Sequence, residues 1–517
     1  MAMSPATRRE LLRLSAALST VGAASSVFGL QLAAMGEAAA QQASDYRALV
    51  CIFLYGGNDS NNTVLATDTD SWNRYWAARN TGNDPIALMP VGTPVTAVGA
   101  ISPVTGRTAR RDSPENWGGV LPITLAVPNP VPPGTSATER TIALNPFLAP
   151  LVPIWDAGRL AIAANVGPLI QPTTKDQYRA RSVPLPANLM SHNDQQSTWQ
   201  AGAAEGARRG WGGLMIDQLL SGNGTNAVFS AISTAGNAVF LSGRDVVQYQ
   251  VTTAATPAVR ITPAVATTLF SSATGPSRLA EIIRDTGGAN YFGVDHAARV
   301  VRSMDSATTL NDSFTAAAVT AIPAPAQIVN PVTGASETNQ LAVQLQTIAR
   351  LIAANATLGL RRQVFFVSLG GWDNHDVQNS TQSVLLNRVG HAMSYFDGVL
   401  ANIGGIDMRS LVTTFTASDF SRTFTTNGDG TDHAWGAHHF IMGGAVSGRR
   451  IYGQYPTLGV DQGSFSNPNM SGNILIPQMS VDQLGATLGA WLGVSDSALL
   501  SIFPNLANFT QRNLAFV

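Results

Sequence analysis

Five short apolar segments spaced along the chain constrain its fold more than any other feature. They cover residues 48–55, 160–166, 364–369, 410–417 and 439–446, and each is followed within two residues by glycine or aspartate. Apolar runs of this length are typical of strands that are buried on both faces, as in a parallel sheet. The segments therefore predict a central, mostly parallel sheet.

Helical patterns lie between several of these segments. Asn145 and Pro146 have the order of an N-cap and a first helical residue, and apolar residues recur at helical spacing over 339–357. A further helix is expected over 380–401. Strands that alternate with helices favour an α/β fold with a doubly wound, mostly parallel sheet and helices on both faces. Right-handed crossovers would then bring the carboxyl ends of the strands to one edge of the sheet.

Two regions interrupt this alternation. Residues 86–141 are rich in Pro, Gly and Thr and are predicted to form an irregular insertion. Residues 222–336 mix strand-like runs with helical patterns near 277–283 and 296–310, which predicts a cap-like insertion. Hydrophobic residues make up 45% of the chain, enough for a large core, so we expect residues 41–517 to form a single domain with these two insertions.

The first 40 residues have the features of an export signal. Arg8 and Arg9 precede a weakly apolar stretch, and the alanine triplet 38–40 offers a signal-peptidase site. We expect residues 1–40 to be a signal peptide for the twin-arginine export machinery, so that the mature protein is periplasmic or extracellular. The alternatives are an amphipathic helix and an uncleaved anchor. Serines and threonines interrupt the stretch, and no other segment is apolar over the length of a membrane span, so no stable span is expected in the mature chain.

Charge and cysteine content exclude several classes of function. Charged residues make up 12% of the chain, against about 25% in ordinary soluble proteins, and the formal net charge is −1. No run of Lys and Arg follows the N-terminal segment, so nucleic acid is not an expected partner, because phosphate-backbone binding needs clustered cations. Cys51, inside ALVCIFLY, is the only cysteine, which excludes an intramolecular disulfide and a cysteine-based metal site.

Carboxylates and imidazoles gather next to the predicted strands. GGNDSNNT, GGWDNHD and SDFSRT follow three of them, and TNGDGTDHAWGAHHF leads into the last one. Ligands of open parallel sheets bind at the carboxyl ends of the strands, so these side chains predict a site for a divalent ion, which would be Zn²⁺, Mn²⁺, Mg²⁺ or Ca²⁺. A structural role is the alternative for each residue taken singly, since aspartates form turns after strands and His438 and His439 adjoin an apolar strand. The candidate ligands are Asp59, Asp373, His375, Asp419 and His433.

Ser191, in LMSHNDQQSTWQ, is a candidate nucleophile. It stands where a helix is predicted to begin, so its hydroxyl would meet backbone N–H groups and the positive end of a helix dipole, which suit an anionic substrate. A metal ion there would lower the pKa of the hydroxyl. The alternatives are a plain helix N-cap and a role for His192 or Asn193, which are equally well placed.

Together these segments resemble a known family. RALVCIFLYGGNDSNNTV, SHNDQQSTWQ, GGWDNHDVQ, SDFSRTFTTNGDGTDHAWGAHHFIMGGAV and the C-terminal VDQLGATLGAWLGVSDSALLSIFPNL are similar, in this order, to the exported domain-of-unknown-function 1501 family, which itself looks related to alkaline phosphatases and sulfatases. The resemblance implies an alkaline-phosphatase-like sandwich with two metal ions and a serine nucleophile. By position it implies that Ser191 is the nucleophile and that the metal ligands are Asp59, Asp373, His375, Asp419 and His433.

The sequence also departs from this pattern. Phe420 follows Asp419 where the superfamily commonly has histidine, and no cysteine lies in a sulfatase-type C-x-P-S-R sequence. We therefore expect an exported metal-dependent hydrolase of phosphate or sulfate esters, or a degenerate relative that keeps the fold. Arg422 would bind an anionic oxygen of a small-molecule or polymeric ester substrate, unless it is a solvated loop arginine. The alternatives are a non-catalytic cell-surface or polymer-binding protein with a structural metal site, and a metal-dependent phosphomutase.

Overall fold

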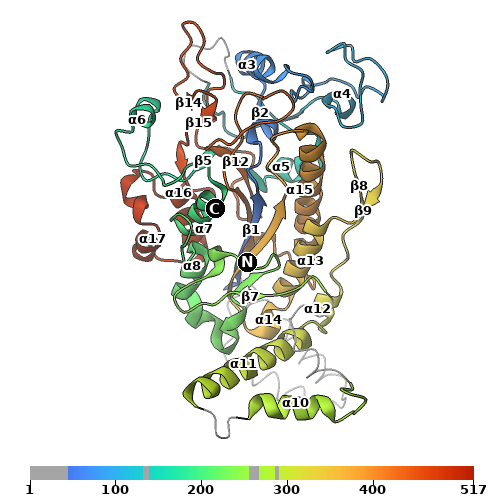
Figure 1. The fold of residues 1–517 in the computed structure, drawn as a ribbon, viewed down its shortest axis with the longest axis vertical. Coiled ribbons are helices and arrows are strands. Elements are labelled where there is room, and N and C mark those ends of the chain that lie inside the picture. Colours follow the sequence, from blue (N-terminus) through green and yellow to red (C-terminus); the bar gives the residue numbers. More distant parts are fainter. Residues whose placement is uncertain (1–44, 132–138, 255–266, 286–289) are drawn as a thin grey trace, which may run out of the picture. The chain divides into compact units, whose positions relative to one another are not determined.

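A nine-stranded sheet forms the centre of residues 47–517 (Figure 1). The structure is a computed structural model that describes residues 45–131, 139–254, 267–285 and 290–517, so the predicted signal peptide, residues 1–40, lies outside the described residues. The strand order is β13-β5-β12-β11-β1-β10-β6-β7, with β16 beside β5. These strands are β1 (Arg47–Tyr55), β5 (Leu160–Gly167), β6 (Ala231–Ser233), β7 (Tyr249–Gln250), β10 (Arg362–Gly370), β11 (Val412–Ser418), β12 (Ala437–Met442), β13 (Ile451–Tyr452) and β16 (Met479–Ser480).

All strands of this sheet run the same way except β12. β1 pairs in parallel with both β10 and β11, whereas β12 is antiparallel to β11 and to β5. The predicted mixed α/β fold with a mostly parallel sheet is therefore confirmed. The expectation that every strand ends at one edge is wrong for β12, because the loop 419–436 that precedes it contains no helix to carry the chain back across the sheet. The start of β12, not its end, lies beside the end of β11.

Helices cover both faces of the central strands. Leu49, Cys51 and Phe53 of β1 share one core cluster with side chains of the helices α8 (Trp211–Leu219) and α16 (Val481–Leu492). The intervening Val50 and Ile52 are equally buried, on the opposite face. Figure 1 shows α7 (His192–Ala201), α8, α16 and α17 (Asp496–Ile502) on one side of the strands, and α13 (Gln340–Ala353) and α15 (Gln378–Leu400) on the other.

The helices begin where the sequence provides caps. Asn339 caps α13 by accepting hydrogen bonds from the backbone of the first turn, and α14 (Asn355–Leu358) completes the helical stretch predicted over 339–357. The predicted helix over 380–401 is α15. Asn145 caps the 3₁₀ helix η2 (Pro146–Leu151), which leads into α5 (Val152–Asp156).

The two predicted insertions differ from one another in structure. The described part of 86–141 is largely irregular and contains only α4 (Pro114–Trp117) and β3 (Leu121–Ile123). The segment 222–336 first adds β6 and β7 to the main sheet and then forms α10 (Gly275–Arg284) and α11 (Tyr291–Ser313). None of the helices in the described ranges is both long and apolar enough to cross a membrane.

The remaining elements are short. They are η1 (Ser60–Asn62), β2 (Val64–Ala66), α3 (Thr69–Arg79), β4 (Ile142–Leu144), α6 (Lys175–Ala180), η3 (Leu220–Phe229), η4 (Val239–Leu241), α12 (Ala317–Thr320), β8 (Ile328–Val329), β9 (Ser336–Glu337), η5 (Arg409–Leu411), β14 (Met470–Ser471), β15 (Ile474–Leu475) and η6 (Pro504–Asn508).

Candidate metal centre

Loops from distant parts of the sequence meet at the edge where β1, β10 and β11 end. The backbone N–H of Trp372, after β10, donates to the carbonyl of Tyr55 at the end of β1. The N–H of Gly56, after β1, donates to the carboxylate of Asp419, after β11, at 3.1 Å. α7 begins at the same place, because the ring of its first residue, His192, bonds to Asp419. The edge therefore gathers side chains that lie far apart in the sequence.

Three histidines and one aspartate converge there, and we call His192, Asp373, His375 and His433 the His/Asp cluster. One ligand atom each from His192, Asp373 and His433 lies within 4.8 Å of the others, a spacing that could hold a metal ion. His375 joins them, with its Nε2 3.0 Å from Asp373 Oδ1 and 3.0 Å from His433 Nε2. Within the described ranges, no group of three or more His, Cys, Asp and Glu residues with this spacing is found outside the His/Asp cluster.

Each histidine of the cluster has its Nδ1 atom held by an oxygen. His192 Nδ1 lies 2.7 Å from Asp419 Oδ2, and His375 Nδ1 lies 3.1 Å from Asp432 Oδ1. His433 Nδ1 donates to the carbonyl of Met190 at 2.8 Å. A carbonyl only accepts, so the neutral His433 ring carries its proton on Nδ1 and leaves a lone pair on Nε2. The same arrangement orients ligand histidines in metal proteins.

Asp419 acts on the cluster through His192. Its carboxylate is fully buried and accepts from the Gly56 N–H and, at 2.8 Å, from Gln196 Nε2 in addition to its bond with His192. The hydrogen bond to Asp419 raises the pKa of His192 and outweighs the opposite effect of burial. Asp419, predicted as a metal ligand, lies behind His192 in this structure and fixes the orientation of that ring.

Arg422 holds the carboxylate of the cluster. Its guanidinium donates to Asp373 Oδ1 at 2.7 Å and to the carbonyl of Thr431, and its side chain is fully buried. Burial alone would raise the pKa of Asp373, but the hydrogen bond and charge of Arg422 outweigh burial and lower it. Burial also lowers the pKa of His433. A metal ion requires an ionised carboxylate and neutral imidazoles. The shifts of Asp373 and His433 favour these states, whereas the raised pKa of His192 favours a protonated ring, whose proton a metal ion would have to displace. Arg422, which was predicted to bind substrate, donates to Asp373 and Thr431 in this structure.

The cluster is open to solvent on one side. The side chains of His375 and Asp373 are 47% and 44% exposed, and those of His192 and His433 are 28% and 25% exposed. The residues behind them, Asp419 and Arg422, are fully buried. The arrangement thus has a rigid, buried support and an accessible front.

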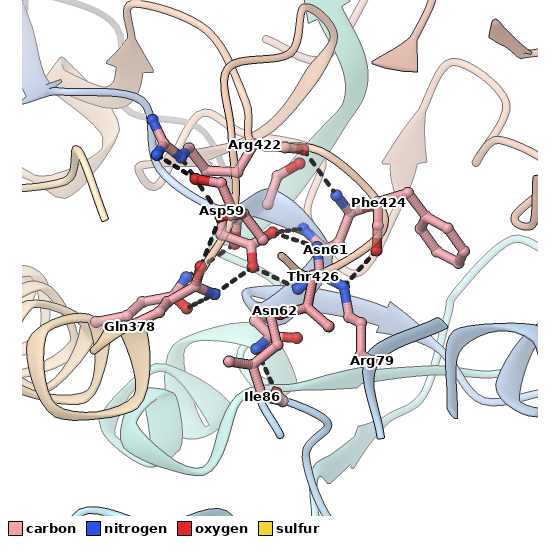
Figure 2. Close-up of polar contacts among 12 residues, drawn as sticks. Asp59, Asn61, Asn62, Arg79, Ile86, Gln378, Arg422, Phe424 and Thr426 are labelled. Carbon is pink, nitrogen blue, oxygen red and sulfur yellow. Dashed lines mark hydrogen bonds and ion pairs between the residues drawn. The ribbon is translucent and has the colours of Figure 1, made fainter. Parts of the chain in front are cut away.

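Asp59 belongs to a different network (Figure 2). Both of its carboxylate oxygens bond to the guanidinium of the fully buried Arg79, which also donates to the carbonyls of Thr423 and Phe424. Gln378 Nε2 donates to Asp59 at 2.7 Å, and the Asn61 N–H donates at 3.1 Å. A guanidinium therefore sits where the predicted role of Asp59 would require a metal ion.

Ser191 lies beside the cluster in the chain, but its hydroxyl is engaged elsewhere. Ser191 Oγ donates to Asp194 Oδ2 at 2.8 Å and makes no capping hydrogen bond to the helix. Its two neighbours contribute more directly, since Met190 offers its carbonyl to His433 and His192 belongs to the cluster.

His438 and His439 are interior residues of β12. Both are buried, and burial lowers the pKa of each to about 3. His438 Nδ1 accepts from the N–H of Asn165 at 3.0 Å, and the His439 ring packs edge-on against Trp199. Neither residue takes part in the His/Asp cluster.

Three residues that take part in the His/Asp cluster or hold its rings were not among the predicted ligands. His192 was only an alternative to Ser191, although the order Ser-His-Asn-Asp at a helix start was the available signal. Asp432 directly precedes His433, but no pattern in the sequence indicates that Asp432 pairs with His375. The carbonyl of Met190 carries no side-chain signature at all, so only the fold could place it.

A family comparison covers almost all of these elements. The model of the family described as "Protein of unknown function (DUF1501)" matches residues 46–502, a range that includes every residue of the cluster. A search of the curated proteins finds no match to the chain.

Proposed function

We propose, for this chain that belongs to the DUF1501 family, the function of an exported, metal-dependent hydrolase of phosphate or sulfate esters. One observation carries the proposal: three histidine Nε2 atoms converge on the Asp373 carboxylate while an oxygen holds each Nδ1 atom. Such an arrangement is costly to maintain for isolated surface histidines and is typical of a metal centre.

The chemistry of the donor atoms supports a transition metal. Imidazole nitrogens suit Zn²⁺ and similar ions, whereas Mg²⁺ and Ca²⁺ prefer oxygen ligands. His192, Asp373, His375 and His433 would hold the ion, with Asp419, Asp432 and Met190 behind them. The engagement of Asp59 by Arg79 supports one ion rather than two.

The exposed front of the cluster supports catalysis over a structural role. Structural zinc sites are closed by protein ligands, whereas catalytic sites keep an accessible position, and here Asp373 and His375 are nearly half exposed. A divalent ion, when bound, polarises an ester oxygen and lowers the pKa of water. In the hydrolysis of such an ester, the oxygen of water would bond to phosphorus or sulfur, the bond from that atom to the alcohol oxygen would break, and the alcohol oxygen would take up a proton from the attacking water.

The residues of this chain would prepare that reaction. Arg422 keeps Asp373 ionised and fixed in place, and Asp419 fixes the ring of His192. Water is the proposed attacking group, because the Ser191 hydroxyl donates to Asp194. The mostly parallel sheet with helices on both faces supports an alkaline-phosphatase-like, doubly wound arrangement.

Removal of a cluster ligand tests the metal centre. Protein purified without chelators should contain one transition-metal ion per chain, and Asp373→Ala or His433→Ala should lose the ion and the hydrolysis of 4-nitrophenyl phosphate and sulfate. Elemental analysis and ester turnover measure both effects, with circular dichroism as the check on folding.

Ser191→Ala is the matched variant. It should keep both the ion and the activity; loss of activity with the ion retained would make Ser191 the nucleophile after all. Metal-free, inactive wild-type protein would contradict the hydrolase, and an ion that raises the melting temperature without any turnover would favour a non-catalytic protein with a structural metal site.

Export by the twin-arginine route is part of the proposal and rests on Arg8 and Arg9 with the alanine triplet 38–40. Replacement of both arginines by lysine should retain the protein in the cytoplasm, because the export machinery reads the arginine pair. Cell fractionation of wild type and variant measures this. Equal export of the two would contradict a twin-arginine signal.

A further inference from the structure

A cavity of about 760 Å³ lies in the connection between α6 and α7. Its lining comes entirely from residues 178–190 and includes Tyr178, Val183, Leu185 and Leu189. The volume falls within the range of about 300–1,000 Å³ that is usual for small-molecule sites. The cavity is thus large enough for a bicyclic aromatic group.

The cavity and the His/Asp cluster share a wall. Met190 lines the cavity, and its carbonyl accepts the hydrogen bond from His433 Nδ1 at 2.8 Å. His192 of the cluster follows Met190 by two residues. Met190 therefore places the cavity next to the His/Asp cluster.

The two arginines of the cavity wall differ in their ion pairs. Arg179 pairs with Asp461 at 3.2 Å, and Lys175 binds the same carboxylate at 2.6 Å. Arg181 ends α6 in a left-handed conformation, is exposed, and has no carboxylate within ion-pair distance among the residues that the structure describes. The wall therefore contains one cation, Arg181, that forms no ion pair with a carboxylate of the described ranges.

We propose that this cavity binds the alcohol portion of the ester substrate, and that this portion is an apolar or aromatic body carrying a second anionic group that Arg181 binds. The inference rests on the proposed function for the reacting end of the substrate. Apolar side chains would cover the body, and the guanidinium would select an anionic substituent on it.

The alcohol itself is the probe, because it contains the proposed recognition features without the reacting group. Isothermal titration calorimetry with 6-hydroxynaphthalene-2-sulfonate should show binding to the wild-type protein, and binding of uncharged 2-naphthol should be weaker. Arg181→Gln should weaken the sulfonate about threefold to fivefold, as expected for a partly exposed ion pair, and leave 2-naphthol unchanged.

Arg299→Gln is the matched control, because it removes the same charge from α11, where Arg299 pairs with Asp295. It should bind both compounds as the wild type does. Equal affinity of wild type and Arg181→Gln for the sulfonate, or no binding to either, would overturn the inference.

Kinetics then separate this inference from the proposed function. The phosphate ester of the sulfonated naphthol should have a lower KM than phenyl phosphate, and only Arg181→Gln should remove that advantage. Arg181-dependent binding of the alcohol without any ester hydrolysis would reject the hydrolase and keep the cavity. Hydrolysis of both esters with the same KM and no effect of Arg181→Gln would reject the cavity and keep the hydrolase.

Discussion

At the residue scale, Asp419 supports the His/Asp cluster through the ring of His192. It is fully buried, and its Oδ2 atom accepts from Gly56, Gln196 and the ring of His192. These bonds determine which nitrogen of His192 faces Asp373. A direct metal ligand would also stand just after a strand. The sequence position of Asp419 therefore led to its prediction as a ligand.

The Asp419→Asn variant tests this supporting role. The amide keeps the volume but loses the charge that orients and polarises His192, so metal affinity should fall by about 10–100-fold, as for other outer-shell partners. Competition with a chromophoric chelator measures the affinity. Asp432→Asn is the comparison, because Asp432 supports the more exposed His375, and it should have a smaller effect. Unchanged affinity in Asp419→Asn would contradict the role.

At the scale of elements, the Asp59–Arg79 pair connects three parts of the fold. Arg79 is the last residue of α3, Asp59 follows β1, and the carbonyls of Thr423 and Phe424 belong to the loop after β11. Both side chains are buried. The loop after β11 also carries Arg422 and His433, so the pair anchors the segment that supplies part of the cluster.

The Arg79→Met variant should destabilise the fold by about 3–5 kcal/mol, because it leaves the Asp59 charge buried without a partner. Urea denaturation measures the loss. The double variant Asp59→Asn/Arg79→Met should lose less than the sum of the single variants. Arg110→Met, which breaks the exposed pair with Asp84, should cost below about 1 kcal/mol. A similar cost for Arg79→Met and Arg110→Met would contradict the anchoring role.

At the scale of the whole molecule, buried histidines make stability depend on pH. Burial lowers the pKa values of His438 and His439 from 6.5 to about 3. At a pH between these two values, both histidines are protonated in the unfolded chain but not in the folded chain. Their contribution to stability is complete above pH 6.5 and is lost as pH falls towards 3, by about 1.4 kcal/mol per pH unit for each histidine. Burial raises the pKa of Asp482 from 3.8 to about 6, which acts in the opposite direction between those two values.

Urea denaturation at several pH values checks this dependence. The free energy of unfolding should fall from pH 6.5 to pH 5. His439→Gln should reduce the slope below pH 6.5, and Asp482→Asn should increase it. His296→Gln, on the exposed side of α11, should leave the slope unchanged. A wild-type free energy that is constant from pH 5 to 8 would contradict the buried neutral state of both histidines.

The class of fold, and the edge of the sheet where polar side chains gather, follow from local patterns in the sequence. Continuous apolar runs such as 364–369 predict buried strands, because only the interior of a layered fold covers both faces of a strand. The polar residues that follow such a run must then lie at the end of the strand. Asp373 and His375, which follow the run 364–369, were placed at the end of a strand in this way. These are local consequences of periodicity and composition.

Which of the polar residues meet depends on how distant segments pack together in three dimensions. Asp59, Asp373 and Asp419 occupy equivalent positions after their strands, yet Arg79 engages the first, the second joins the His/Asp cluster, and the third stands behind His192. The antiparallel direction of β12 brings His433 to the cluster and leaves His438 and His439 in the interior. Hydrogen bonds and ion pairs act over about 3 Å, so such choices depend on partners from distant segments, and no local pattern encodes them.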